Sequence, residues 1–252
     1  MNVLTLPIII LLGGKGERFY SQSNSPKQLV KVTKNVLLID IILQYKRSGI
    51  NYFILPLGNK SDFFINFFKN KGNIKKYNLN IIKSYKEIKP EKINIQIFKA
   101  GTKTSKLNRI IKSLKKIRNY KGYFGVCYGD IFANINFKKY FKFFSSKSKK
   151  AILTSYKEKS PYGHLIINKN FVKNFIEKPY LEKPINIGFY FFDYINFIQI
   201  NKKFSSKTVE LEDNILPYYA KNNKLISVLH KGYHFTINNN KDLEELRKTK
   251  KN

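Results

Sequence analysis

A glycine-rich stretch near the start of the chain is the first group of residues that could do chemistry. Its glycines are Gly13, Gly14 and Gly16. They follow the apolar run 7–12, which predicts a buried strand, and the cations Arg18 and Lys27 lie shortly after them. Glycine lets backbone amides approach a ligand closely, so a strand that feeds such a loop suits phosphate oxygens. The spacing fits neither the Walker pattern nor GxGxxG, and a glycine-rich turn with two surface cations is the alternative.

A carboxylate marks a second candidate position in the middle of the chain. Residues 122–128 predict a central strand, and Gly129 and Asp130 follow at its carboxyl end. Because ligands of open α/β sheets bind outside the carboxyl ends of the strands, Asp130 is placed to hold a metal ion. An ordinary Gly-Asp turn is the alternative.

The elements that must position these residues alternate between strands and helices up to residue 150. The predicted strands are 7–12, 51–57, 80–84, 93–98 and 122–128. The predicted helices are one ending at Gly49, 60–71, and one that opens within 101–109 and runs to about 118. This alternation implies a parallel sheet with right-handed crossovers. We therefore expect an α/β fold with a Rossmann-like, mixed but mostly parallel central sheet flanked by helices.

Short strands dominate the second part of the chain. They are 151–156, 164–167, 171–176 and 185–192. We expect them to form a small antiparallel extension, followed by a helix at 208–219, strands at 225–229 and 233–237, a last helix at 242–248 and a frayed lysine-rich tail. The whole chain, 1–252, is expected to be a single domain with a core, 1–150, and a second part, 151–252.

The composition narrows the class of protein. The net charge is +32, but 43 of the 48 basic residues are lysines spread over the whole chain, whereas base readout favours arginine. Such a field still attracts polyanionic substrates such as nucleoside triphosphates. No apolar run approaches the ~20 residues of a membrane span. The single cysteine, Cys127, fits a reducing compartment and a core position, so a cytoplasmic protein is expected. His164, His230 and His234 show no metal spacing.

Together the motifs form an ordered set over nearly the whole chain that resembles the sugar-1-phosphate nucleotidyltransferases, most of all their glucose-1-phosphate cytidylyltransferase branch. The matching motifs are Gly13-Gly14-x-Gly16-x-Arg18, Pro26-Lys27, Gly101-x-x-Thr104 through Arg109, Tyr128-Gly129-Asp130, Tyr162-Gly163, Glu177-Lys178-Pro179, Asn186-x-Gly188, Thr208-Val209-Glu210-x-Glu212 and His230-x-Gly232-Tyr233. The resemblance implies a glycosyltransferase-A-like nucleotidyltransferase fold with a sugar-binding extension. It also implies Mg²⁺ and transfer of a nucleotidyl group from a nucleoside triphosphate, with CTP favoured, to glucose 1-phosphate or a related hexose 1-phosphate.

The resemblance assigns a role to individual residues. It implies that the catalytic residues are Arg18 and Lys27. The implied nucleotide-binding residues are Leu12, Gly13, Gly14, Gly16, Thr104 and Arg109. The implied sugar-phosphate-binding residues are Glu177, Lys178, Asn186 and Gly188, and the implied metal ligands are Asp130 and Asn238. From the sequence, Arg109 is either a cation on a helix surface or a ligand near the nucleotide.

The sequence departs from the branch at three places, and two missing glycines near the base pocket leave the base preference open. Lys106, Leu107 and Asn108 stand where the branch usually has Thr-Gly-Gly, Ile187 replaces a glycine, and Asn238 replaces an aspartate. An Asn side chain can still offer a carbonyl oxygen to Mg²⁺. A nucleotide-binding homologue that has lost catalysis is therefore a second hypothesis, and a basic nucleic-acid-binding protein is a third. A homo-oligomer is compatible with the sequence, and no nucleic-acid or membrane partner is expected.

Overall fold

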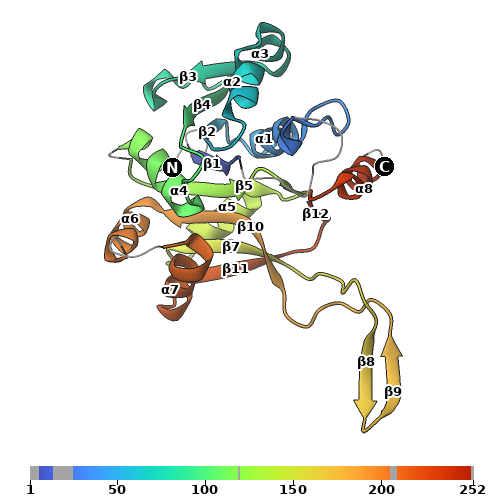
Figure 1. The fold of residues 1–252 in the computed structure, drawn as a ribbon. Helices are drawn as coiled ribbons and strands as arrows, with labels where there is room; N and C mark the ends of the chain where they lie inside the picture. The colour runs from blue at the N-terminus through green and yellow to red at the C-terminus, as the bar shows by residue number, and fades with distance from the viewer. Residues whose placement is uncertain (1–5, 14–24, 119, 205–208, 251–252) are drawn as a thin grey trace.

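A central sheet of eight strands organises the computed structural model, which describes residues 6–13, 25–118, 120–204 and 209–250 (Figure 1). In spatial order the strands are β11 (Leu225–His230), β7 (Ala151–Tyr156), β10 (Ile185–Asp193), β5 (Tyr123–Tyr128), β1 (Pro7–Leu11), β2 (Tyr52–Leu57), β4 (Ile93–Lys99) and β3 (Leu79–Ile82). The run from β5 to β3 is parallel, β10 is antiparallel to both of its neighbours, and β11 is parallel to β7. The predicted fold class is confirmed.

Both faces of this sheet are buried, as the uninterrupted apolar run in β1 requires. Ile8 and Ile10 join one core, and Ile9 and Leu11 join the other. The first core is covered by α1 (Leu37–Arg47), α2 (Ser61–Lys69), α5 (Phe137–Ser145) and α8 (Asn240–Thr249). The second core is covered by α4 (Lys106–Leu114), α6 (Tyr194–Lys203) and α7 (Leu216–Lys221). The carboxyl ends of β1 and β5 are therefore held at one rigid edge.

Helix boundaries differ from the prediction in several places. The predicted helix 60–71 ends early, because the side chain of Asn70 accepts a hydrogen bond from Asn73 N–H and starts a separate helix, α3 (Lys71–Tyr77). The predicted helix 208–219 begins as a π-helical turn, η6 (Leu211–Ile215). Elements without a counterpart in the prediction are α5, α6, β6 (Ile131–Ala133) and the 3-10 turns η3 (Lys27–Leu29) and η4 (Tyr85–Glu87). The predicted helix that runs to about 118 ends as the 3-10 turn η5 (Lys115–Ile117).

The strands after residue 150 divide between two places. β7 and β10 extend the main sheet, whereas β8 (His164–Asn168) and β9 (Phe171–Ile176) form a free antiparallel hairpin that projects from the body (Figure 1). All residues of both hairpin strands are exposed. We call residues 164–176 the arm. The last short strand, β12 (His234–Thr236), pairs with β6.

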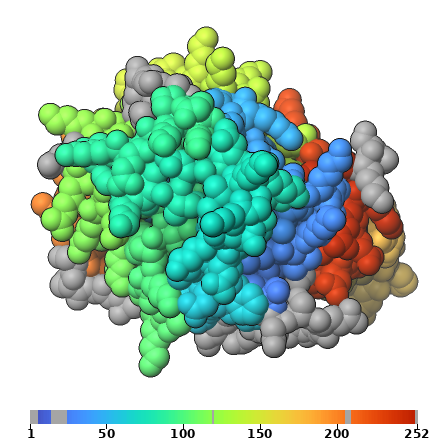
Figure 2. All heavy atoms as spheres, turned by 90° about the horizontal axis from the view of Figure 1, so that it is seen from above, coloured from blue at the N-terminus to red at the C-terminus, as the bar shows by residue number. Residues whose placement is uncertain are grey.

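The C-terminal helix is docked rather than frayed, so the predicted mobile tail is wrong. Arg247 donates hydrogen bonds to the carbonyl oxygens of Lys31 (2.6 Å) and Val32 (3.2 Å). Lys250 Nζ lies 2.5 Å from Asp40 Oδ2 on α1. Figure 2 shows this red C-terminal segment against the blue N-terminal third of the chain. The basic side chains of this helix end bind backbone carbonyls and a buried carboxylate. The lysine-rich composition of the segment gave no sign of these partners.

Among the helices of the described ranges, not one combines the length and the apolar character that a membrane span requires.

Candidate active site

Lys27 and Asp130 form an ion pair at the carboxyl edge of the sheet. Lys27 begins η3, and Asp130 follows β5 in the turn before β6. Lys27 Nζ lies 2.8 Å from Asp130 Oδ2 and donates a hydrogen bond of 2.7 Å to the carbonyl oxygen of Ile237. The two side chains are 12% and 31% exposed, so a ligand can reach both from solvent. The two residues that the sequence singled out for charge are thus in contact.

Asn238, the second predicted metal ligand, lies beside this pair. Ile237 N–H donates to the carbonyl oxygen of Asp130 (2.9 Å), which places Asn238 one residue from Asp130 in space. Asn238 is exposed, and its N–H donates to Asp242 Oδ2 (2.6 Å) in the cap of α8. Within the described ranges, no three His, Cys, Asp or Glu side chains come together to hold a metal by themselves. A cation here would rely on few protein oxygens.

The base of the glycine-rich loop is held tightly against β2. Gly13 has φ +84°, and a Cβ there would lie 2.7 Å from Gly58 N, so both its conformation and its surroundings require glycine. Asn59 N–H donates to the Gly13 carbonyl oxygen (3.2 Å). Leu12, which precedes it, is buried. Outside the described residues lie Gly14, Gly16 and Arg18.

Arg109 anchors this loop from α4. Its guanidinium donates to the carbonyl oxygens of Leu12 (2.6 Å), Gly13 (3.4 Å) and Thr104 (3.0 Å). It is only 6% exposed, so the surface-cation interpretation is wrong. A Cβ on Gly58 would lie 2.3 Å from the guanidinium, which shows how closely the two pack. Burial lowers the pKa of Arg109 from its usual value, and its donors act on the loop backbone.

A cavity of about 380 Å³ opens next to Arg109. Its lining residues are Thr104, Ser105, Lys106, Arg109, Glu210, Glu212 and Asp213. One carboxylate oxygen of Glu210 is buried and has no hydrogen-bond partner among the residues that the structure describes. The sequence analysis included Glu210 and Glu212 in a motif of the resemblance but gave neither a role at the site. Glu210 is the extended residue that precedes η6 and Glu212 lies in the first turn of η6, so both reach the cavity from the start of this helix.

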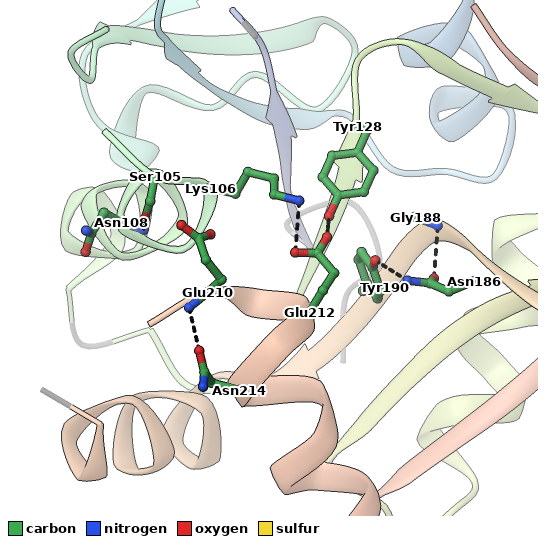
Figure 3. A network of polar contacts seen from close by, with 10 residues as sticks. All are labelled: Ser105, Lys106, Asn108, Tyr128, Asn186, Gly188, Tyr190, Glu210, Glu212 and Asn214. Carbon is green, nitrogen blue, oxygen red and sulfur yellow. Dashed lines mark hydrogen bonds and ion pairs between the residues drawn. The ribbon is translucent and has the colours of Figure 1, made fainter. Parts of the chain in front are cut away.

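A network of polar contacts connects this cavity to the strands of the sheet (Figure 3). Glu212 accepts a hydrogen bond from the Tyr128 hydroxyl and forms an ion pair with Lys106 (Nζ to Oε2, 2.9 Å). The Lys106 ammonium also lies 5.3 Å from the centre of the Tyr128 ring. Lys106, one of the departures from the related branch, therefore has a defined place at the site.

Asn186 and Gly188, predicted to line the sugar pocket, lie on β10 beside Tyr128. The Asn186 amide accepts from Gly188 N–H (3.1 Å) and donates to the Tyr190 hydroxyl (2.7 Å). Gly188 has φ +73°, and a Cβ there would meet the Tyr128 ring at 2.4 Å. The pair thus shapes the backbone that supports Tyr128, and Figure 3 shows it next to the Lys106–Glu212 pair.

Glu177 and Lys178 are not part of this group. They follow the end of the arm, where each side chain is 60% exposed. Within the described part of the chain, their ionic contact is with each other, at 3.5 Å. The structure therefore does not bring these two predicted sugar-phosphate ligands to Lys27 and Asp130 of the same chain.

Two further titratable groups lie in packed surroundings. Burial raises the pKa of the Cys127 thiol to about 12, as suits a core residue of β5. Burial, followed by the charge of His230, lowers the pKa of His234 to about 4. His234 packs against the ring of Tyr156, with ring centres 5.2 Å apart. These groups support the fold around the site.

Comparison with known proteins assigns the family. The sequence model of the nucleotidyl transferase family matches residues 8–248. The chain belongs to the nucleotidyl transferase family, which confirms the resemblance carried by its motifs. It is 30% identical over 245 residues to the "Probable glucose-1-phosphate cytidylyltransferase" of Bacillus subtilis (strain 168), covering 95% of this chain and 94% of that protein. It is 25% identical over 191 residues to the glucose-1-phosphate cytidylyltransferase of Salmonella typhimurium, covering 72% and 73%.

Solved structures agree on the fold. The crystal structure of HddC from Yersinia pseudotuberculosis has a TM-score of 0.66 at 20% identity and covers 97% of this chain and 99% of that one. The same protein complexed with GMP-PN gives a TM-score of 0.62 at 18% identity, with 97% and 99% covered. At this identity the likeness concerns the fold alone.

Proposed function

We propose that this protein transfers a nucleotidyl group from CTP to glucose 1-phosphate or a related hexose 1-phosphate, giving a nucleotide-sugar and pyrophosphate. The observation that carries the proposal is the Lys27–Asp130 pair, which lies at the carboxyl edge where a glycine-rich loop leaves β1. The names of the two cytidylyltransferase relatives support the choice of base and sugar.

The chemistry requires placement and charge more than a base. An oxygen of the sugar phosphate attacks the α-phosphorus, a P–O bond forms, and the bond to the β-phosphate breaks with pyrophosphate leaving. A phosphate monoester dianion needs no proton removed to act as nucleophile. Lys27, a compact cation, is proposed to stabilise the charge between the two anions. Arg18, outside the described residues, is proposed to meet the β- and γ-phosphates through its fork of donors.

The oxygens around Asp130 fit a divalent cation. Mg²⁺ prefers oxygen ligands and often takes only one or two carboxylates, with phosphates and water completing the shell. The Asp130 carboxylate, 31% exposed, the Ile237 carbonyl and the adjacent Asn238 offer such oxygens. We propose that Asp130 and Asn238 hold Mg²⁺. When bound, the ion would neutralise phosphate charge.

The remaining residues are proposed to bind the two substrates. We assign nucleotide binding to residues 1–150, where Gly13 and the cavity near Thr104 and Arg109 would contact the nucleotide. Residues 151–252 are assigned the sugar phosphate, with Asn186 and Gly188 shaping its pocket. The three acidic side chains in the cavity would repel a triphosphate, so we assign the cavity to uncharged parts of the nucleotide.

Self-association is proposed to occur through the arm. A two-stranded hairpin is at best marginally stable by itself in water, yet the arm exposes seven large apolar side chains. They are Leu165, Ile166, Ile167, Phe171, Val172, Phe175 and Ile176. The arm also carries Glu177 and Lys178 away from the Lys27–Asp130 pair of their own chain. A homo-oligomer would cover the apolar surface and offer a way to complete the sugar-phosphate site.

A substrate panel tests the function. Four nucleoside triphosphates are combined with several sugar 1-phosphates and Mg²⁺, and pyrophosphate release is measured. We expect turnover with CTP and glucose 1-phosphate. Lys27→Ala should lower the rate by about 10²-fold or more, the scale of losing one transition-state donor, whereas Lys150→Ala, on a peripheral ion pair, should not. A folded protein that turns over no pair would refute the assignment.

A further inference from the structure

The Lys27 ammonium lies against the oxygens that a divalent cation would use. It lies 2.8 Å from Asp130 Oδ2 and 2.7 Å from the carbonyl oxygen of Ile237. These are a hard carboxylate oxygen and a hard carbonyl oxygen from two different segments, which meet where β6 pairs with β12. An ammonium donates to such oxygens in the same positions from which they would coordinate Mg²⁺.

Two cations cannot both lie against Asp130 Oδ2 and the Ile237 carbonyl oxygen without strong electrostatic repulsion. Like charges within a few ångströms repel strongly where the surroundings are partly desolvated, and the Lys27 side chain is only 12% exposed. The backbone of Lys27 is fixed as the first residue of η3, after Pro26, but its side chain is a flexible four-carbon stem. The ammonium can therefore move while the backbone stays in place.

We propose that Lys27 and the divalent cation compete for Asp130, so that arrival of the cation with the triphosphate releases the ammonium from Asp130 toward the phosphates. This proposal rests on the proposed function for the identity of the anion that then receives Lys27. The exchange at Asp130 depends only on the contacts above. In this arrangement Lys27 neutralises the carboxylate until the metal replaces it, and one event both loads the metal and frees the catalytic amine.

Metal binding tests the exchange without any turnover. Mn²⁺ alone is titrated into the full chain, with the bound fraction followed by electron paramagnetic resonance. Lys27→Met removes the ammonium and keeps the length of the side chain, so Mn²⁺ should bind about tenfold tighter than to the wild type. Lys27→Arg keeps a competing cation and should leave the affinity near that of the wild type.

Matched variants separate this effect from a change of overall charge. Lys150→Met also removes one ammonium that is paired with a carboxylate, at 3.3 Å from Asp193, and should leave Mn²⁺ affinity unchanged. Asp130→Asn should abolish the tight site, both alone and combined with Lys27→Met. Thermal unfolding of every variant checks that each is folded.

The outcomes are decisive. Unchanged or weaker Mn²⁺ binding by folded Lys27→Met would overturn the exchange, as would the absence of any site that depends on Asp130. Peptide-mapped amine labelling gives a second readout: Lys27 should become more reactive when Mn²⁺ is added, and equal labelling would contradict the proposal. If Mn²⁺ behaves as expected while no triphosphate is turned over, the exchange stands and the proposed function fails.

Discussion

Arg109 acts on the backbone of the glycine-rich loop. Its three hydrogen bonds end on carbonyl oxygens of residues that flank the loop or the start of α4, and the guanidinium packs directly on Gly58. Among the described contacts of Arg109 no carboxylate takes part. The guanidinium therefore fixes the backbone at Leu12 and Gly13, where the chain leaves β1, and we propose that this positions the loop for nucleotide binding.

We expect Arg109→Lys to raise the KM for the nucleoside triphosphate by about tenfold, because an ammonium cannot reproduce the planar fork that reaches several carbonyls at once. The value of kcat should fall less. Arg47→Lys, on an exposed arginine of α1, is the matched control and should leave both constants unchanged. Steady-state kinetics with varied triphosphate measures the split. A fall in kcat alone would argue against positioning through the loop.

His234 makes folding depend on pH. Its pKa is about 4 in the folded protein, below the ordinary value of 6.5, chiefly because of burial. Between these two pH values the unfolded chain binds a proton that the folded chain does not, so stability is lost as the pH falls through this window. His234→Gln should reduce this loss, whereas His164→Gln, exposed on the arm, should not. Unfolding free energies measured from pH 4 to 8 check the slope, and parallel curves for wild type and His234→Gln would contradict the expectation.

At the scale of elements, α8 is bonded to the segment 27–40, which begins with Lys27. Arg247 and Lys250 contact Lys31, Val32 and Asp40, and Ile237, just before the helix, accepts from Lys27 itself. The C-terminal helix thus contacts the chain shortly after Lys27, and Ile237, three residues before the helix, accepts a hydrogen bond from the Lys27 ammonium.

Arg247→Ala should weaken the attachment of α8 to residues 31 and 32. Losing two partly exposed hydrogen bonds costs about 1–2 kcal/mol, which lowers the Tm by roughly 2–8 °C in a chain of this size. Turnover should fall as well, because η3 loses part of its support, and Arg247→Lys should restore part of it. Calorimetry and pyrophosphate release on the same samples measure the two effects. Equal activity in Arg247→Ala and Arg47→Ala would show that the Arg247 contacts do not position Lys27.

The sequence predicted the elements that carry strong patterns. The apolar runs of β1, β2, β4 and β5 and the glycines around them are unambiguous, so the parallel core followed from them. Lys27 and Asp130 were singled out separately, and it was the resemblance to the family that placed them in one site. The helices α5 and α6 were not predicted, because Phe, Ile, Lys and Asn recur throughout the chain and obscure the helical periodicity of the sequence.

Long-range contacts account for most of the remaining differences. Arg109 was left between two interpretations, since its partners are carbonyls that no motif shows. The cavity needs α4 and η6 to meet, about 100 residues apart in sequence. The docked end of α8 needs a carboxylate, Asp40, from the first third of the chain. Such pairings depend on tertiary packing, which local patterns do not encode.

At the scale of the whole molecule, the arm is the feature that a single chain leaves unsatisfied. Its apolar side chains lie on both of its faces, and surfaces of this kind in soluble proteins commonly mark interaction sites. The body of the chain offers the arm no packing within the described residues, since every residue of β8 and β9 is exposed. The proposed partner is another copy of the same chain.

The double variant Phe171→Ser, Phe175→Ser should shift the protein to a smaller assembly, because it removes the two largest apolar side chains of the arm strands. Light scattering coupled to size-exclusion chromatography, over a range of concentrations, measures the mass. Phe143→Ser, an exposed aromatic on α5, is the matched control. A wild type that stays monomeric at every concentration would refute self-association, and an unchanged oligomer in the double variant would place the interface elsewhere.

The contact between Gly58 and Arg109 constrains how this enzyme can be re-engineered. A Cβ on Gly13 would meet the backbone of Gly58, and a Cβ on Gly58 would meet the Arg109 guanidinium. Randomising any one of the three positions alone should yield mostly inactive clones, whatever base is selected for. A library aimed at a new nucleotide should keep residues 13, 58 and 109 unchanged as a set. It should vary the residues that line the cavity instead.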